Sequence, residues 1–161
     1  MHNLQPRIEK LTQKMLIGIS LPMSIINNRT GELWGTFMPR RHEVSNTVNT
    51  DLISMQIYDN TYFKAFNPAN TFTKWAGAEV SSFETVPEGM STIVIPEGMY
   101  AVFDYKGSSA DSSIFQYIFS EWLPKSGYQL DNRPHFEVLG KNYKNNDPES
   151  EEEIWIPISR R

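Results

Sequence analysis

The chain has 161 residues, of which 39% are hydrophobic and none is cysteine, and its 15 Lys and Arg against 19 Asp and Glu give a net charge of -4. This length and composition predict one globular domain spanning residues 1–161, large enough to bury a core without crosslinks. The absence of cysteine excludes disulfide frameworks, thiolate zinc sites, iron–sulfur clusters and cysteine nucleophiles, and the scattered basic residues argue against direct binding of nucleic acid.

The first half of the chain predicts one strand, one helix and two further strands. Apolar, β-rich residues indicate a strand over residues 14–22, which ends at a proline. A short amphipathic helix is predicted from near Thr30 to Pro39, because its apolar residues recur at helical spacing until the proline. Alternating residues predict strands over 54–59 and 74–82, separated by a turn-rich stretch.

The second half predicts the same kinds of element in the same order. Residues 99–105 are rich in aromatic and β-compatible side chains and predict a strand. A helix is predicted from a cap near Asp111 to Pro124 and Gly127, and strands over 135–140 and 153–158 follow. The polar segment 142–153 between those strands is interpreted as an exposed hairpin loop.

This repeated order predicts the fold class. Internal repeats are placed at about residues 14–82 and 96–159, each contributing a β-α-β-β unit. Two similar halves related by a pseudo-twofold axis would form an α+β fold with a mixed or antiparallel sheet. We expect both helices on one face of that sheet and a ligand cleft on the other.

The alternation of side chains along each predicted strand gives the candidate binding residues. Small and aliphatic residues are assigned to the face under the helices, and a mixed aromatic and polar set to the other face. One carboxylate among aromatic rings suits a cationic or hydrogen-bond-donating aromatic compound. The candidate ligand-binding residues are Glu137, Trp155, Trp75, Tyr58, Gln56 and Leu139.

Several of these aromatic and acidic residues have a second interpretation. Trp75 and Trp155 could pack in the core instead, because large aromatic side chains are commonly buried for their area. Glu137 could be an exposed strand residue bonded to water. The aromatic residues at helical spacing are assigned to the core and not to a site; they are Trp34, Phe37, Phe115, Phe119 and Trp122.

Other function classes have little support in the sequence. No stretch approaches the length of a membrane helix and the N-terminus has no signal-peptide pattern, so the cytoplasm is the expected location. His2, His42 and His135 are too dispersed to predict a metal site. Nucleotide-binding and hydrolase motifs are missing from the sequence, and no cofactor is expected.

Four ordered motifs carry a family resemblance: IPEGMYAVFDYKG, EWLPKSGYQL, RPHFEVLG and the terminal EIWIPI. Together they resemble the GyrI-like small-molecule-binding domain family, which includes the effector-binding domains of AraC-type and multidrug-responsive MerR-type transcription regulators. The resemblance implies a duplicated β-α-β-β fold of the SHS2-like type whose central cleft binds cationic or planar aromatic compounds. It maps an acidic residue at the bottom of that cleft onto Glu137, and this chain resembles a stand-alone member.

Three functions remain open at this point. The favoured one is a non-catalytic sensor or sequestering module that binds a small aromatic or cationic molecule, with a protein partner as a further option. The second is a hydrolase of electrophilic, cyclopropane-containing molecules, in which Glu137 and Trp155 would carry the chemistry. The third is a protein–protein inhibitor of the DNA gyrase inhibitor type, acting through an outer surface.

Overall fold

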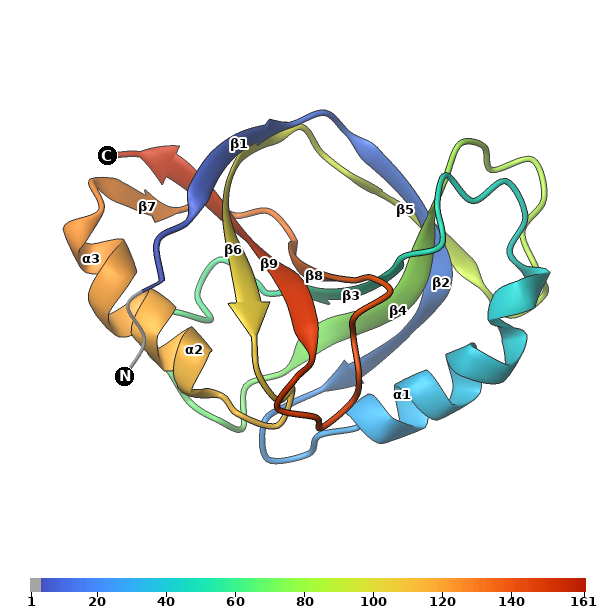
Figure 1. The fold of residues 1–161 in the computed structure, drawn as a ribbon, viewed down its shortest axis with the longest axis horizontal. Coiled ribbons are helices and arrows are strands. Elements are labelled where there is room, and N and C mark those ends of the chain that lie inside the picture. Colours follow the sequence, from blue (N-terminus) through green and yellow to red (C-terminus); the bar gives the residue numbers. More distant parts are fainter. Residues whose placement is uncertain (1–3) are drawn as a thin grey trace.

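The computed structural model describes residues 4–161 and shows an antiparallel sheet of nine strands flanked by helices (Figure 1). The helices are α1 (Thr30–Phe37), continued by a 3₁₀ turn (Met38–Glu43), and a second helix formed by α2 (Ser113–Tyr117), a π-helical turn (Ile118–Trp122) and α3 (Leu123–Lys125). The strands are β1 (Arg7–Leu11), β2 (Lys14–Met23), β3 (Leu52–Ile57), β4 (Phe72–Val80), β5 (Ser91–Ile95), β6 (Gly98–Lys106), β7 (Tyr128–Leu130), β8 (His135–Leu139) and β9 (Glu151–Arg160).

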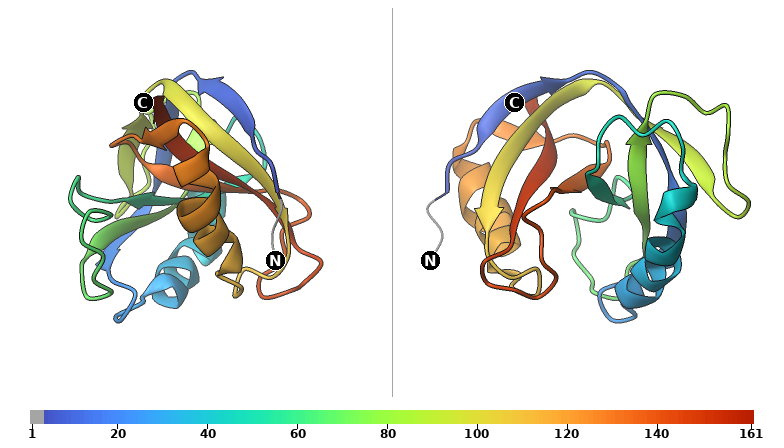
Figure 2. Two further views of the ribbon diagram at one scale, coloured as in Figure 1. Left: turned by 90° about the vertical axis from the view of Figure 1, so that its left-hand side faces the viewer. Right: turned by 45° about the vertical axis from the view of Figure 1, so that its right-hand side comes forward.

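The sheet curls back on itself. Its strand order is β1-β6-β9-β8-β3-β4-β2-β5, with β7 paired to β9. β1 and β2 lie near opposite ends of this order, yet only residues 12–13 join them, and only residues 96–97 join β5 to β6. These short links bring the two ends together, and the strands form an arch over the top of the molecule (Figures 1 and 2).

Three clusters of buried apolar residues fill this architecture. One lies on the inner side of the curled sheet and contains Leu16, Met55, Tyr100 and Phe136. The other two lie outside it, where α1 packs on β2 and β4, and where α2 and α3 pack over β6 and β9. The two helices therefore flank the molecule, with the central strands β3 and β8 between them (Figure 2).

Most predicted elements are present within a few residues of their expected bounds. The sequence missed β1, β5 and β7, which are short strands at the edges of the pairing scheme. It also placed the hairpin loop too far along the chain, because β9 begins at Glu151 inside the acidic run. The pairing of those glutamates with β6 explains the difference: the register extends from Glu151 opposite Lys106 to Pro157 opposite Tyr100.

Residues 4–161 contain no helix that combines the length and apolar character needed to cross a bilayer. In the same range, no three His, Cys, Asp or Glu side chains are grouped so that they could hold a metal ion. His2 lies outside the described residues.

A close approach between β2 and β4 gives a test of the fold. Gly18 lies opposite Gly77, and a methyl group on Gly18 would collide with the backbone of Ala76 and Gly77. We expect Gly18→Ala to lower the free energy of unfolding by about 1–3 kcal/mol. Urea denaturation measures this, and Gly35→Ala is the matched control: its methyl group meets open space on α1, so it should stabilise by about 1 kcal/mol. A neutral Gly18→Ala would contradict the observed strand spacing.

Candidate functional site

Polar side chains gather on the central strands between the two helices. Cross-strand register places Gln56 between Lys74 and His135, and in the next row Glu137 between Ser54 and Ile154. Residues directly opposite one another in a sheet point to the same face. Glu152 lies two residues before Ile154 on β9 and shares that face. We call Ser54, Gln56, Lys74, Glu137 and Glu152 the central cluster.

Glu137 is held by a hydrogen bond from a buried amide. Gln56 Nε2 donates to Glu137 Oε1 at 3.2 Å and lies 3.4 Å from Ser54 Oγ. Burial raises the pKa of Glu137 to about 7, and the charge of Glu152 acts in the same direction. Lys74 and the Gln56 hydrogen bond oppose the shift. The carboxyl group is therefore able to gain or lose a proton near neutral pH.

The other two ionisable groups of the cluster are also perturbed by desolvation. Burial raises the pKa of Glu152 to about 7, against the opposing effect of Lys74. Burial lowers the pKa of Lys74, although both glutamates favour its charged form. Lys74 Nζ donates a hydrogen bond to Thr30 Oγ1, 3.2 Å away on the first residue of α1. Perturbed groups of opposite charge on one face are typical of functional sites.

Aromatic rings border the cluster where β3 ends and β8 begins. The ring of Tyr58 lies with its centroid 4.9 Å from both His135 and Phe63, and Phe63 stacks on Phe119 of the second helix at 5.2 Å. Burial, followed by the charge of Glu137, raises the pKa of Tyr58, so the phenol stays neutral. Burial lowers the pKa of His135 to about 3, so the imidazole is also neutral at physiological pH.

An open groove adjoins the central cluster where β8 ends and β9 begins. It has a volume of about 500 Å³ and shares Glu152 with the cluster. We call it the rim groove. Its lining residues are Thr50, Asp51, Asp104, Tyr105, Lys106, Val138, Gly140, Lys141, Asn142, Glu151, Glu152 and Glu153.

Four of the six predicted site residues lie on the face of the central cluster. Glu137 and Gln56 are in direct contact. Tyr58 follows Gln56 at the strand end and is affected by the charge of Glu137. Leu139 lies opposite Leu52, on the same face as Glu137 two residues earlier.

Trp75 and Trp155 are placed differently from the prediction. A continuous cross-strand row joins Trp75, Met55, Phe136 and Trp155 on the inner side of the curled sheet. Both indoles are buried in the inner core, 7% and 8% exposed, and Phe136 stacks on Trp155 with ring centroids 5.2 Å apart. Their assignment to the face of Glu137 is therefore wrong, and the core interpretation holds for both.

The prediction that Glu137 and the helices lie on opposite faces of the sheet is also wrong. Glu137 lies opposite Ile154, which belongs to the apolar cluster beneath α2 and α3. The helices and the central cluster thus share the outer face. Alternation within each strand was predicted correctly, but the phase between strands depends on register, which no local pattern reveals.

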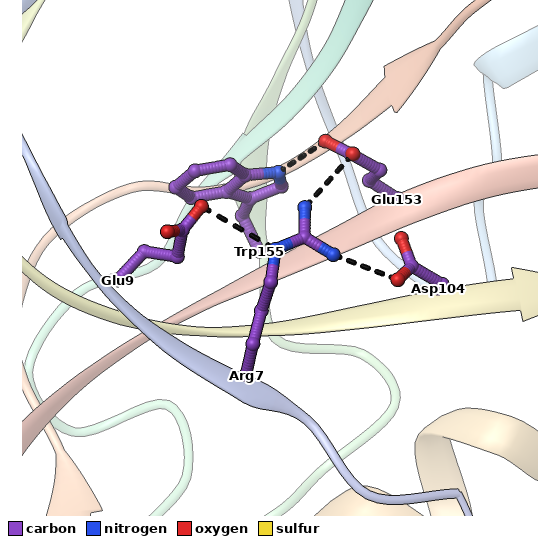
Figure 3. A network of polar contacts seen from close by, with 5 residues as sticks. All are labelled: Arg7, Glu9, Asp104, Glu153 and Trp155. Atoms are coloured by element: carbon purple, nitrogen blue, oxygen red, sulfur yellow. Dashed lines mark hydrogen bonds and ion pairs between the residues drawn. The ribbon is translucent and has the colours of Figure 1, made fainter.

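Trp155 instead takes part in a polar network on its own face (Figure 3). Its Nε1 donates to Glu153 at 3.0 Å, and Arg7 on β1 bridges Glu153 at 2.9 Å and Asp104 at 2.7 Å. These contacts join β1 to β6 and β9. They account for the position of Trp155, which lies on the opposite face of the sheet from Glu137.

Sequence comparison now places the chain among known proteins. The profile of the family described as "Cass2: Integron-associated effector binding protein" matches residues 7–158. The chain belongs to this family. The family resemblance predicted from the four motifs is thereby confirmed, as is the relation to small-molecule binding and to transcription regulation.

A curated relative of this chain is the transcriptional regulator BrlR of Pseudomonas aeruginosa, 30% identical over 158 residues. The match covers 97% of this chain and 56% of BrlR, so the chain spans little more than half of its relative.

Solved structures share the fold of this chain at low identity. The protein SAV2435 bound to tetraphenylphosphonium has a TM-score of 0.69 at 13% identity, covering 97% of this chain and 94% of that one. The integron cassette protein Cass2 from Vibrio cholerae has a TM-score of 0.66 at 15% identity, over 98% and 100% of the two chains. A hydrolase from Listeria innocua has a TM-score of 0.64 at 12% identity, over 96% and 92%.

Three residues of the central cluster were missed by the sequence reasoning. Ser54 lies two residues before Gln56 on β3, so the alternation along that strand places it on the same face. Lys74 alternates with Trp75 on β4, so its place on the Glu137 face could have been found once the phase of β4 was known. Glu152 lies in an acidic run that is typical of a solvated loop, and no signal in the run singles it out.

Proposed function

We propose that the chain binds small aromatic organic cations over the central cluster, with Glu137 as the principal counter-charge. The observation that carries this proposal is a carboxyl group of raised pKa, hydrogen-bonded by Gln56 and set beside aromatic rings, on an outer face between two helices. Opposite charge and ring faces are the two elements that recognise an organic cation.

The energetics favour a cationic ligand over a neutral one. A cation beside Glu137 would stabilise the ionised carboxylate, which burial now disfavours. Each ring face over a cation adds about 0.5–2 kcal/mol, and Tyr58 and Phe63 supply rings next to the cluster. An aromatic cation therefore gains from both contacts, whereas a neutral aromatic molecule gains from the rings alone.

Relatives support the same class of function. SAV2435 was solved with tetraphenylphosphonium, an aromatic cation, on the same fold. BrlR is a transcriptional regulator that contains a segment like this chain. We propose that this chain acts as a sensor or sequestering module in the cytoplasm. We also propose that the halves at about residues 14–82 and 96–159, in each of which a strand and a helix precede further strands, are related by a pseudo-twofold axis.

Hydrolysis is a second candidate, favoured by the paired carboxyl groups. Glu137 and Glu152 both have a pKa of about 7, which suits a general acid or base at neutral pH. Trp155 takes no part in this version, because it lies on the inner face. Tyr58 is an aromatic residue on the same face, and the charge of Glu137 raises its pKa.

Calorimetric titration of the protein with tetraphenylphosphonium chloride and with neutral triphenylphosphine oxide tests the proposal. We expect the cation to bind at least about tenfold more tightly, because only the cation gains from the carboxylate. At 100 times its dissociation constant it should stabilise the fold by about 2.7 kcal/mol in a thermal-shift assay. Equal affinity for both compounds, or no binding of the cation, would overturn the proposal. Turnover of a cyclopropane-containing electrophile that stops in Glu137→Gln would favour hydrolysis instead.

A further inference from the structure

Lys74 places a positive charge inside a site that is otherwise suited to cations. Its side chain is partly buried on β4, opposite Gln56, and its Nζ donates to Thr30 Oγ1 at 3.2 Å. Within residues 4–161, no carboxylate lies within 4.0 Å of this ammonium group, so it has no direct ion-pair partner there. An ammonium group carries three N–H donors, and the hydrogen bond to Thr30 occupies one of them.

The charges of the central cluster are separated along the sheet. Lys74 is on β4, whereas Glu137 and Glu152 are on β8 and β9, and β3 lies between. Neighbouring strands are about 4.8 Å apart, so the backbones of β4 and β8 are about 10 Å apart. The cluster therefore has a positive end next to α1 and a negative end formed by the two glutamates.

We propose that the preferred ligands are zwitterionic aromatic compounds, whose cationic group faces Glu137 and Glu152 while an anionic group accepts hydrogen bonds from Lys74. This inference rests on the proposed function of the same site and names its ligand class. A ligand with both charges matches both ends of the cluster, whereas a simple cation is repelled by Lys74. At about 10 Å and an effective dielectric constant near 20, that repulsion corresponds to roughly tenfold in affinity.

The electrostatic state of the cluster is consistent with a ligand that carries both charges. Both glutamates favour the charged form of Lys74, whereas burial disfavours the ionised form of each glutamate. With both carboxyl groups near half-ionised at neutral pH, the charge of the three side chains sums to about zero. A dipolar ligand meets this dipolar site without leaving an unpaired charge, and a monocation leaves the ammonium group unpaired.

Two rhodamine dyes test the inference because they differ by one ester group. Rhodamine 19 carries a free carboxylate beside its cationic xanthene ring, and rhodamine 6G is its ethyl ester and a simple cation. Fluorescence anisotropy titrations at pH 7.5 or so give both dissociation constants. We expect the wild-type chain to bind rhodamine 19 roughly tenfold more tightly, and Lys74→Met to abolish or invert that preference. Lys74→Arg, which keeps the charge, should retain it.

Matched variants and one further probe separate the outcomes. Lys141→Met removes a charge from the rim groove and should leave the preference unchanged. Three outcomes would overturn this inference and leave the proposed function standing. In the first, Lys74→Met keeps the preference for rhodamine 19; in the second, only Lys141→Met loses it. In the third, the wild-type chain binds tetraphenylphosphonium but neither dye. Failure of the folded wild-type chain to bind tetraphenylphosphonium and both dyes would overturn the proposed function and this inference together.

Discussion

Glu137→Gln should weaken the binding of tetraphenylphosphonium by about 100-fold at pH 8, while triphenylphosphine oxide binds within about threefold of its wild-type affinity. Charge-assisted contacts of partly buried groups contribute a few kcal/mol, and a loss of 2.7 kcal/mol corresponds to 100-fold. Glutamine keeps the shape of Glu137 and removes its charge, so the cation loses its counter-charge and the neutral compound does not. Calorimetric titration of both compounds measures the two changes.

The pH dependence of the same binding reaction has a defined sign. The pKa of Glu137 is about 7, and its protonated form carries no counter-charge. A permanent cation therefore binds best above pH 7, and its affinity falls as the pH drops. If only the ionised form binds, the affinity at pH 5 is about 90-fold lower than at pH 8. Glu137→Gln should make this dependence shallower, with Glu152 supplying what remains.

Stability measurements distinguish lost recognition from lost folding. Folding raises the pKa of Glu137 from 4.5 to about 7. The native state therefore binds more protons than the unfolded state between about pH 4.5 and 7. Stability therefore falls as the pH rises through this window, and Glu137→Gln should be at least as stable as the wild type at pH 8. Glu151→Gln, at an exposed position on the neighbouring strand β9, is the matched control. Tight binding of the cation by a folded Glu137→Gln chain would exclude Glu137 as the counter-charge.

Local patterns were sufficient to predict most of the elements. The helix α1 ends where proline makes further α-helix costly, and the strands β4, β6 and β9 follow alternation or aromatic enrichment. The three missed strands are short, and their stability comes from pairing with distant segments. β1, for example, pairs with β6 more than 85 residues further along the chain, from Arg7 opposite Val102 to Leu11 opposite Gly98.

The composition of the site depends on relations between strands, which the sequence does not show. Glu137 and Gln56 could be predicted as neighbours because both fall on polar positions of their strands, and they are in contact. Trp75 could not be placed, because β4 alone does not show whether Lys74 or Trp75 faces the glutamate. Curling of the sheet adds a second difficulty: its inner face is enclosed by the strands themselves, so aromatic residues there are core and not surface.

Trp155→Ala should lower the free energy of unfolding by about 3–5 kcal/mol, the cost of removing a large aromatic side chain from a core. The indole is 8% exposed, stacks on Phe136, and donates its N–H to Glu153, so the alanine leaves a cavity and removes this hydrogen bond. Urea denaturation followed by tyrosine and far-ultraviolet signals measures the loss.

Trp155→Phe separates this structural role from ligand recognition. Phenylalanine retains most of the buried ring area, so the folded variant should bind tetraphenylphosphonium within about threefold of the wild type, because Trp155 lies on the inner face, away from Glu137. Tyr58→Leu is the matched comparison on the outer face. It should weaken binding of the cation by about threefold to thirtyfold, which is the contribution of one ring face. A tenfold loss in Trp155→Phe with no loss in Tyr58→Leu would place the ligand on the inner side of the sheet and reverse the assignment of the site.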